Sequence, residues 1–324
     1  MRAARCHAYD GIDAVTVDDV PVPPVGPGDV RVAVRAAAIN FPDLLMLEDK
    51  YQISYPPPFT PGSEFSGVVE EVGDDVTVLT PGDRVFGATL VGAFAEQVVV
   101  GAGAVQRIPD GVDFGSAAGF GVAHETAWHS LRSVAEVHEG EWVVVLGAAG
   151  GVGLAAVEIA HHLGGRVLAA AAGAARLAVC ETRGAEALVD YRAEDLKVRI
   201  KELTDGGADV VLDPVGGSYA EAALRAMRRD GRFVTVGYAS GEIPRIPLNL
   251  VLLKGVIIKG FEMGSFIFRE PEAMLRGRAE LLELLATGAL RPHIGGTFAL
   301  EDVQDALRAV AERRTTGKVL VEIR

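Results

Sequence analysis

Residues 142–153 read WVVVLGAAGGVG, and this stretch decides the fold. The first five residues are apolar and have the length of a buried strand, and the glycines that follow lead into a segment with helical spacing. Apolar residues recur on one face of that segment, at Val152, Ala155, Ala156, Ile159, Ala160 and Leu163. Gly164 and Gly165 then end the helix. A strand, a glycine turn and a helix in this order are typical of the first unit of a doubly wound parallel sheet.

Five further apolar runs follow, and amphipathic segments separate them. They predict strands at residues 167–171, 187–190, 209–212, 232–236 and 256–259. Strands that are apolar on both faces belong to parallel sheets, because helical crossovers cover both sides. The sequence therefore predicts an α/β fold with a Rossmann sheet.

The segment before this sheet has a different rhythm. Between Gly28 and about Val100, short alternating runs at residues 30–35, 67–72 and 92–100 are cut by proline and glycine, which predicts antiparallel strands in a small barrel or sandwich. After Gly260 only two helices and one strand are expected, at residues 272–286, 301–312 and 318–323. These elements are too few for a domain of their own. We therefore expect residues 1–121 and 262–324 to form one domain and residues 122–261 to form the other.

Composition excludes several classes of function. With 324 residues, 49% of them hydrophobic and 23% charged, the chain has room for two folded domains. The net charge of -13 and the lack of lysine or arginine clusters argue against nucleic acid as a partner. The uncharged stretch 142–157 holds four glycines and is shorter than a membrane span needs, so no membrane segment is expected. Two cysteines and the absence of a signal-peptide pattern at the start predict a cytoplasmic protein.

The glycine turn after Leu146 has a chemical purpose in such folds. Backbone amides at a helix N-terminus bind pyrophosphate, and glycine lets the backbone approach it closely. A site for NADH would place a carboxylate about 20 residues further on, at the end of the second strand. No carboxylate occurs between Glu158 and Glu181, and Arg176 could bind a ribose phosphate instead. The sequence thus favours NADPH, although Arg176 could also be a solvated helix residue.

Several motifs occur in a fixed order along almost the whole chain. They lie at residues 36–43, 61–69, 82–85, 92–96, 147–153, 213–217 and 317–320. With these motifs the chain resembles the zinc-independent quinone oxidoreductase branch of the medium-chain dehydrogenase/reductase superfamily. The resemblance implies a GroES-like β-barrel domain, a Rossmann cofactor domain, and a homodimer joined through the sheet edge at Val256–Lys259.

The resemblance also implies the residues that contact the cofactor. The nicotinamide half is expected to contact Asn40, Thr126, Val236, Gly237, Glu262, Met263 and Gly264. The phosphate half is expected to contact Ala149, Gly150, Gly151, Val152, Gly173, Arg176 and Tyr191. Alternatives remain open for three of these: Asn40 could cap a turn, Thr126 could be a helix hydroxyl, and Tyr191 could be an aromatic residue at a strand end.

The chain departs from zinc-dependent relatives, which carry a catalytic cysteine and a Gly-His-Glu motif. The corresponding stretches here read Asn-Phe-Pro-Asp at residues 40–43 and Gly-Ser-Glu at residues 62–64, so no metal is expected. Without a metal to stabilise an alkoxide, the substrate must already be electrophilic. We expect a quinone, or alternatively an activated alkene such as an enone, a 2-haloacrylate or an enoyl thioester. A nucleotide-binding protein with little turnover is the third hypothesis.

Three residues are candidates for the catalytic step. Tyr51 matches the position of a substrate-pocket tyrosine in the family, and a neutral phenol can donate a proton to the reduced product. Tyr51 could also be a loop aromatic that covers the cleft. Asn40 is a second candidate. Asp43 is a third, since it could orient a water or Tyr51, or simply form a turn.

Overall fold

The structure is a computed structural model that describes residues 1–323. Contacts along the chain divide it into two compact units. Unit 1 holds Met1–Val122 together with the segment from Arg291 onward, and unit 2 holds Ala123–Leu290.

Unit 2 contains a six-stranded parallel sheet with the strand order β10-β9-β8-β11-β12-β13. The strands are β8 (Trp142–Leu146), β9 (Arg166–Ala171), β10 (Ala187–Asp190), β11 (Ala208–Asp213), β12 (Met227–Thr235) and β13 (Ile257–Gly260). All six predicted strands are present. The central strands β8 and β9 are almost wholly buried, because helices cover both faces of the sheet. The edge strand β13 is largely exposed. The order of the strands reverses between β8 and β11, which makes this the switch point of the sheet.

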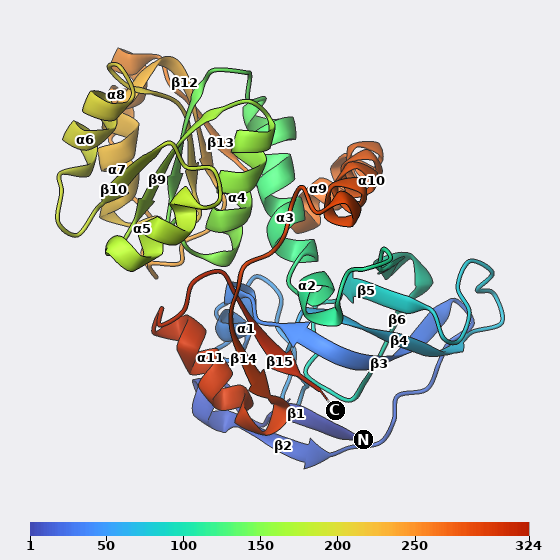
Figure 1. Cartoon of the computed structure of the whole chain (residues 1–324). Coiled ribbons are helices and arrows are strands. Elements are labelled where there is room, and N and C mark those ends of the chain that lie inside the picture. The colour runs from blue at the N-terminus through green and yellow to red at the C-terminus, as the bar shows by residue number, and fades with distance from the viewer. Residues whose placement is uncertain (324) are drawn as a thin grey trace. The chain divides into compact units, whose positions relative to one another are not determined.

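Helices cover both faces of this sheet (Figure 1). They are α4 (Gly151–His162), α5 (Ala174–Glu181), α6 (Leu196–Leu203), α7 (Ser218–Arg225) and α8 (Leu248–Lys254). Unit 2 also holds the end of α3 (Gly121–Trp128), a π-helix (His129–Ala135), α9 (Met263–Arg269) and α10 (Pro271–Thr287). Leu146, Leu168 and Phe233 are among the fully buried residues of the core between helices and sheet.

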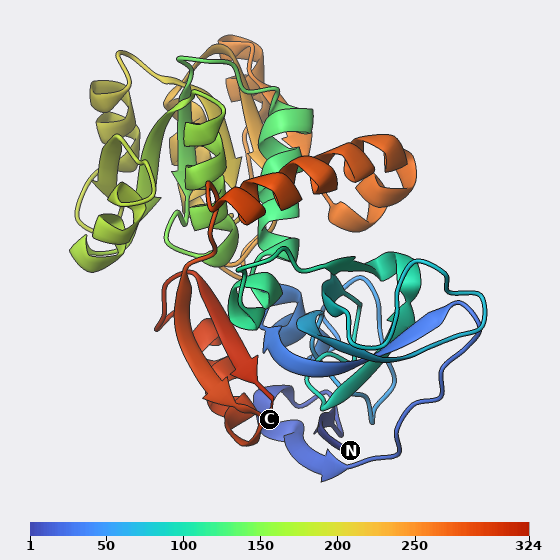
Figure 2. The same ribbon diagram turned by 45° about the vertical axis from the view of Figure 1, so that its right-hand side comes forward.

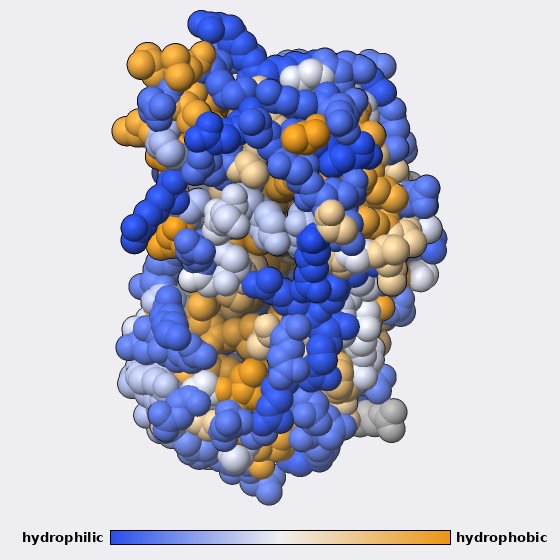
Figure 3. All heavy atoms as spheres, turned by 90° about the vertical axis from the view of Figure 1, so that its left-hand side faces the viewer, coloured by the Kyte–Doolittle hydropathy of each residue, from blue (hydrophilic) through white to orange (hydrophobic). Residues whose placement is uncertain are grey.

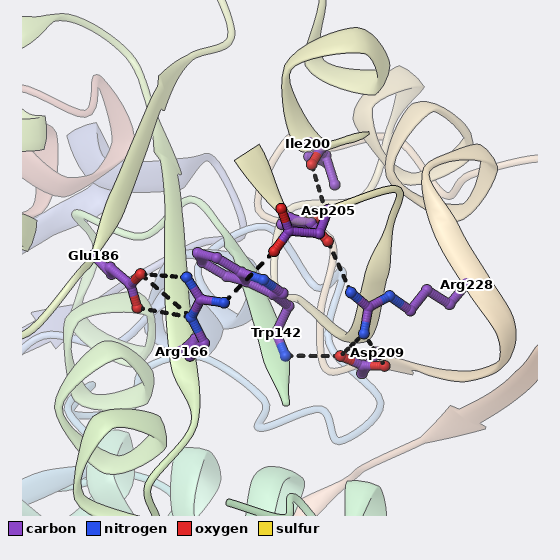
Figure 4. Close-up of polar contacts among 8 residues, drawn as sticks. Trp142, Arg166, Glu186, Ile200, Asp205, Asp209 and Arg228 are labelled. Carbon is purple, nitrogen blue, oxygen red and sulfur yellow. Dashed lines mark hydrogen bonds and ion pairs between the residues drawn. The ribbon is translucent and has the colours of Figure 1, made fainter. Parts of the chain in front are cut away.

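Charged side chains connect the amino ends of the strands in unit 2 (Figure 4). Arg166 at the start of β9 pairs with Glu186, and its guanidinium lies 4.1 Å from the ring centre of Trp142. Asp209 accepts a hydrogen bond from the Trp142 amide at 2.8 Å and pairs with Arg228 at 3.0 Å. The charged groups of Arg166, Asp209 and Arg228 at this edge are therefore paired, and the opposite edge carries the glycine turn.

Unit 1 is built from antiparallel strands, as the alternating pattern predicted. One sheet has the order β14-β15-β3-β4-β5-β7, with β6 paired to β3, and β1 and β2 form a separate pair. Only β14 and β15 run parallel to each other among the described strands of this unit. The strands are β1 (Arg2–Cys6), β2 (Val15–Asp19), β3 (Asp29–Ala38), β4 (Glu64–Val72), β5 (Arg84–Ala88), β6 (Gln97–Gly101), β7 (Val105–Arg107), β14 (Ile294–Ala299) and β15 (Lys318–Glu322).

Short helices complete unit 1. They are α1 (Phe41–Met46), α2 (Phe114–Ala118) and α11 (Val303–Ala311). The last of these lies against β14 and β15 (Figure 2), with Val303, Ala306 and Leu307 buried on its inner face. Phe65 and Phe94 are fully buried in the centre of the unit.

The second domain boundary differs from the prediction. The sequence placed it after residue 261, whereas the compact units divide at Leu290, so α9 and α10 belong to unit 2. The reason is the packing of α10 against α3 and the π-helix: Arg278 forms an ion pair with Glu125 at 2.9 Å, and Gly277 lies against His129. After Leu290, β14, a 3₁₀-helix (Leu300–Asp302), α11 and β15 complete unit 1. The expectation that all elements after Gly260 would do so does not hold for α9 and α10.

The surface carries apolar residues among hydrophilic ones, as the face in Figure 3 shows. Leu248, Leu252 and Leu253 on α8 are 78%, 80% and 69% exposed. None of the helices described within residues 1–323 has the length and apolar character needed to cross a membrane.

Candidate active site

The glycine turn forms the junction between β8 and α4. Gly147 has a φ of +57°, which favours glycine, and Gly150 precedes the helix as its N-cap residue. A Cβ atom on Gly153 would lie 2.2 Å from the carbonyl oxygen of Gly147, so this glycine is needed for close packing of helix on strand. A Cβ atom on Gly150 would meet only that same oxygen, at 3.4 Å, so this exposed position does not need glycine for packing.

Most of the predicted cofactor residues of unit 2 lie at one edge of the sheet. Ala149, Gly150, Gly151 and Val152 follow β8, Gly173 and Arg176 follow β9, and Tyr191 follows β10. On the other side of the switch point, Val236 and Gly237 follow β12, and Glu262, Met263 and Gly264 follow β13. The carboxyl ends of parallel strands share one edge, so the two predicted halves of the cofactor site flank the crevice between β8 and β11. Thr126 lies elsewhere, buried within α3.

The phosphate side of this edge has no carboxylate directly after β9. Gly173, with a φ of +86°, is the N-cap residue of α5, and Arg176 lies in the first turn of that helix. The Arg176 guanidinium donates a hydrogen bond to the carbonyl oxygen of Ala172 at 3.2 Å, which holds it near the strand end. A cation and a helix N-terminus at the same place both favour an anionic group.

Tyr191 packs against a residue that sequence reasoning missed. Its ring lies 4.3 Å from the ring of Tyr219, centre to centre, and Tyr219 is in the first turn of α7. The two tyrosines are 28 positions apart and follow different strands. The sequence could have predicted this contact only through the rule that the loops after parallel strands lie at one edge of the sheet.

The turn after β11 supports the other side of the crevice. The buried carboxylate of Asp213 accepts hydrogen bonds from the amides of Val215 and Gly216, each at 2.8 Å. Burial raises the pKa of Asp213, although these two hydrogen bonds lower it. The Asp213 carbonyl oxygen also accepts a hydrogen bond from the Val236 amide at 2.9 Å. Asp213 therefore shapes the backbone on which Val236 and Gly237 sit, a role that the sequence analysis did not give it.

Glu262 is occupied at the start of α9. Its carboxylate accepts hydrogen bonds from the amides of Gly264 at 2.7 Å and Ser265 at 2.6 Å. Burial raises the pKa of Glu262, but the hydrogen bonds from Ser265 and Gly264 outweigh burial and lower it overall. The carboxylate is thus an N-cap, and the backbone of the same segment faces the carboxyl edge.

In unit 1, Asn40 and Asp43 stand at the start of α1. The Asp43 carboxylate accepts a hydrogen bond from the Asn40 amide at 2.7 Å, which ties the first turn together. The Asn40 side chain points elsewhere: its Nδ2 donates to the Ser63 hydroxyl at 3.2 Å, and its Oδ1 accepts from the Lys318 ammonium at 2.6 Å. Asn40 is therefore part of a buried polar cluster, and it does not merely cap a turn.

Lys318 and Glu64 complete this cluster, and the sequence analysis gave neither of them a role. Lys318 is the first residue of β15 and Glu64 is the first residue of β4, and their side chains pair at 2.5 Å. They are 4% and 1% exposed, so each charge is compensated almost entirely by the other. Loss of one partner in such a buried pair typically costs about 3–5 kcal/mol of stability.

Asp43 is fully buried beside this cluster. Burial raises the pKa of Asp43 to about 7, although the Asn40 amide, the Ser63 side chain and the charge of Lys318 each lower it. A carboxyl group with that pKa exchanges a proton near neutral pH, which is a property common at functional sites. Tyr51, the third catalytic candidate, is partly buried and packs against the hydrophobic core of the same unit.

No cluster of three or more metal-ligating side chains occurs within residues 1–323. The carboxyl edge of the sheet in unit 2 is made instead of backbone amides, glycines, two tyrosines and one arginine, and unit 1 holds the buried polar cluster. A doubly wound sheet with a glycine turn at its switch point, in one chain with an antiparallel barrel, defines the architecture of the medium-chain dehydrogenases/reductases.

Comparison with known proteins agrees with this architecture. Residues 26–139 match the family described as alcohol dehydrogenase GroES-like domain, and residues 151–279 match the family described as zinc-binding dehydrogenase. A quinone oxidoreductase-like protein 2 homolog from Nematostella vectensis is 37% identical over 99% of this chain and 88% of its own length.

Solved structures point the same way. The quinone oxidoreductase from Thermus thermophilus, also solved in complex with NADPH, is 34% identical, with a TM-score of 0.88 over 99% of this chain and 100% of its own. The Escherichia coli quinone oxidoreductase in complex with NADPH is 27% identical, with a TM-score of 0.91 over 99% of this chain and 100% of its own. The chain belongs to the quinone oxidoreductase branch of the medium-chain dehydrogenase/reductase superfamily.

Proposed function

We propose that this protein is an NADPH-dependent reductase that transfers hydride to quinones without a metal ion. The observation that carries the proposal is the carboxyl edge of the parallel sheet. There, the glycine turn lies at the switch point, no carboxylate follows β9 directly, and Arg176 stands in the first turn of α5. This combination favours a dinucleotide that carries an extra phosphate on its ribose.

The residues present fit such a cofactor. Gly150 is exposed at the N-terminus of α4, and its missing Cβ leaves the backbone open to a pyrophosphate. Gly173 and Arg176 would bind the ribose phosphate, with Tyr191 beside them. The backbone of Val236, Gly237 and residues 262–264 would hold the nicotinamide end, together with Thr126 and Asn40. NADPH, when bound, supplies the hydride, and the protein supplies position and a dry environment.

The class of hydride acceptor follows from the absence of a metal-ligand cluster within residues 1–323. With no cluster of metal ligands in that range, nothing there would polarise an unactivated ketone as a Lewis acid does. The substrate must therefore be electrophilic without the help of a metal ion, and a quinone meets this condition. We propose that Tyr51 donates a proton to the reduced oxygen. Asn40 and Asp43 hold the start of α1.

The named relatives support this proposal. Those from Thermus thermophilus and Escherichia coli are called quinone oxidoreductases and were solved with NADPH.

We also propose a homodimer and a cytoplasmic location. β13 is the last strand in the sheet order, and its residues Ile257 and Ile258 are 47% and 41% exposed, which suits pairing with a second copy. Cys6 and Cys180 are both buried and are not joined in a disulfide, which suits a reducing compartment.

The function is tested by following NADPH oxidation with a panel of quinones, small enones and enoyl thioesters, with NADH measured alongside. We expect turnover with quinones and a clear preference for NADPH. Equal rates with NADH would contradict the role of Arg176, and turnover only with enones or thioesters would replace the quinone. Calorimetry that detects no binding of either nucleotide would overturn the proposal, as would stoichiometric zinc in the active protein.

The part played by Tyr51 is tested separately with Tyr51→Phe. Loss of the hydroxyl should lower kcat by about a factor of 100 if Tyr51 is the proton donor, because general acid catalysis contributes about 10²–10⁴-fold. Tyr9→Phe is a matched control, since the Tyr9 hydroxyl donates to the carbonyl oxygen of Tyr55 and has no part in the proposed chemistry. A Tyr51→Phe protein with full kcat on every quinone would remove Tyr51 from the mechanism.

A further inference from the structure

The Lys318 ammonium lies among three oxygen atoms: it donates hydrogen bonds to two of them and forms an ion pair with the third. They are the Ile39 carbonyl oxygen at 3.1 Å, the Asn40 Oδ1 at 2.6 Å and the Glu64 carboxylate at 2.5 Å. Lysine is a donor only, so the Asn40 atom beside it must be the carbonyl oxygen of the carboxamide and not the nitrogen. The Asn40 side chain is thereby held in one of its two flip states.

The other end of the carboxamide is only partly used. The Asn40 Nδ2 carries two N–H groups, and one of them donates to the Ser63 hydroxyl at 3.2 Å. Among residues 1–323 no acceptor contacts the second. With its oxygen bound to Lys318, Asn40 has the second N–H group of its carboxamide left to offer to a ligand.

Glu64 keeps this arrangement neutral. One of its carboxylate oxygens pairs with Lys318 and the other accepts a hydrogen bond from the Val122 amide at 2.9 Å. The ammonium is therefore compensated without using Asn40, which is an uncharged third acceptor. Lys318 and Glu64 neutralise each other's charge without the asparagine. The hydrogen bond from Lys318 to Asn40 therefore acts on the orientation of the Asn40 carboxamide.

We infer that Lys318 is a positioning residue, which fixes the Asn40 carboxamide as a hydrogen-bond donor toward a carbonyl oxygen of the bound reactants. This inference rests on the proposed function. Hydride addition to a quinone builds negative charge on such an oxygen, and a fixed donor stabilises that charge in the transition state. Asn40 would be a catalytic residue in this scheme, and Lys318 would act only through it.

The orientation can be measured without any turnover. The chain contains only two asparagines, Asn40 and Asn249, so labelling with ¹⁵N-asparagine gives two side-chain amide pairs in an NMR spectrum. Asn249 is exposed and serves as an internal reference. In the unliganded protein we expect the Asn40 pair to lie apart from that of Asn249 and to show slowed rotation. In Lys318→Met/Glu64→Gln, a variant without the buried charges, the Asn40 pair should move toward that of Asn249. If the Asn40 signals keep the same position in the double variant as in the wild type, the inference is overturned.

Kinetics test the donor role. Asn40→Asp keeps an acceptor for Lys318 but replaces the N–H donor by an oxygen, so kcat with 1,4-naphthoquinone should fall about a hundredfold. Lys318→Met/Glu64→Gln should lower kcat about tenfold, with a smaller change in the KM for NADPH. The matched control is Arg232→Met/Glu141→Gln, which removes a mostly buried ion pair at the amino edge of the other sheet.

The outcomes separate the inference from the proposed function. If the wild-type protein oxidises NADPH and Asn40→Asp keeps its kcat, the donor role is wrong. The positioning role is wrong if Lys318→Met/Glu64→Gln matches the control variant in kcat. Should the double variant fail to fold, Asn40→Asp still decides, because it retains both Lys318 and Glu64. A wild-type protein that reduces none of the acceptors refutes the proposed function, and the donor role with it, while the NMR result still decides the orientation.

Discussion

Two glycines of the same turn have different reasons to be glycine. Gly153 allows α4 to approach β8, since a Cβ there would lie 2.2 Å from the Gly147 oxygen. Gly150 faces solvent, and a Cβ there would find room within the fold. Gly153 is therefore needed for the packing of α4 on β8. Gly150 is not needed for packing, and we attribute it to the close approach of a ligand.

Gly150→Ala should therefore separate binding from folding. We expect a melting temperature within a few degrees of the wild type and a loss of NADPH affinity of at least about tenfold, because the added methyl group occupies space needed by the pyrophosphate. Calorimetric titration measures the affinity. Gly103→Ala is a suitable control, since a Cβ at that position meets nothing within 4 Å. Unchanged NADPH affinity in Gly150→Ala would contradict the placement of the pyrophosphate.

Asp43 makes stability depend on pH. Its pKa is about 7 in the folded protein and near 3.8 when exposed, so between these values the folded protein binds more protons than the unfolded chain. The contribution of Asp43 is therefore present at low pH and is lost as the pH rises toward 7. In Asp43→Asn, the free energy of unfolding should fall less between pH 5 and pH 7 than it does in the wild type.

Urea unfolding at several pH values measures this difference. His129 has the opposite effect, because burial and then the charge of Arg278 lower its pKa to about 4, but it is present in both proteins and cancels in the comparison. Asp110→Asn, at an exposed position, is the control. Parallel pH profiles for the wild type and Asp43→Asn would show that the buried carboxyl does not titrate in this range.

Part of the candidate site could be proposed from the sequence. Asn40, Asp43 and the glycine turn stood out because each belongs to a local motif. Lys318 and Glu64 did not, because the contact between Lys318 and Asn40 spans 278 positions in the sequence. A lysine at the start of a strand gives no sign of being buried until its partners are known.

Elements were predictable where one face or both faces are apolar. The six strands of the parallel sheet and the last helix, α11, were predicted because their patterns are complete within each segment. The assignment of α10 was not, since an amphipathic helix shows that it has a buried face but does not show what covers it. Its partner is the end of α3 with the π-helix, where the His129 ring lies 6.4 Å from the ring of Phe261 and 4.6 Å from that of Phe266, centre to centre.

Gly277 is the contact point of α10. A Cβ on this residue would lie 2.6 Å from the His129 ring and 3.1 Å from the Trp128 side chain. We expect Gly277→Ala to destabilise the protein by about 1–3 kcal/mol through overpacking, an effect that the gain of about 1 kcal/mol in helix propensity only partly offsets. Chemical denaturation measures the change. Arg276→Ala, on the exposed side of α10, should be close to neutral, and a Gly277→Ala protein more stable than the wild type would refute the tight contact.

For the whole molecule, the edge of the parallel sheet matters most. β13 has a partner on one side only within the described sheet, and its isoleucines are exposed. If two copies pair there, Ile257→Lys/Ile258→Lys should convert a dimer into a monomer, because two like charges would face their copies across the interface. Light scattering coupled to size exclusion measures the mass. Ile243→Lys, at a loop residue that is 68% exposed, is the control. A wild-type monomer would contradict the proposed interface.

The division of the chain into two units could be read from the sequence, because the apolar rhythm changes near Gly119 from period two to alternating strands and helices. The return of the chain to unit 1 after Leu290 could not be located, since β14 was not recognised as a strand and the sequence of α10 does not show which unit covers it. Non-local pairing decides such boundaries.

β15 sits between β14 and β3, and it carries Lys318. On the ribosome, β3 and β4 emerge long before β15 is made. The buried polar cluster around Asn40 can therefore form only after almost the entire polypeptide has been synthesised. Nascent chains that end before residue 318 should fold the parallel sheet but have no catalytic activity. In the incomplete barrel, the carboxylate of Glu64 would lack the ammonium that compensates its charge.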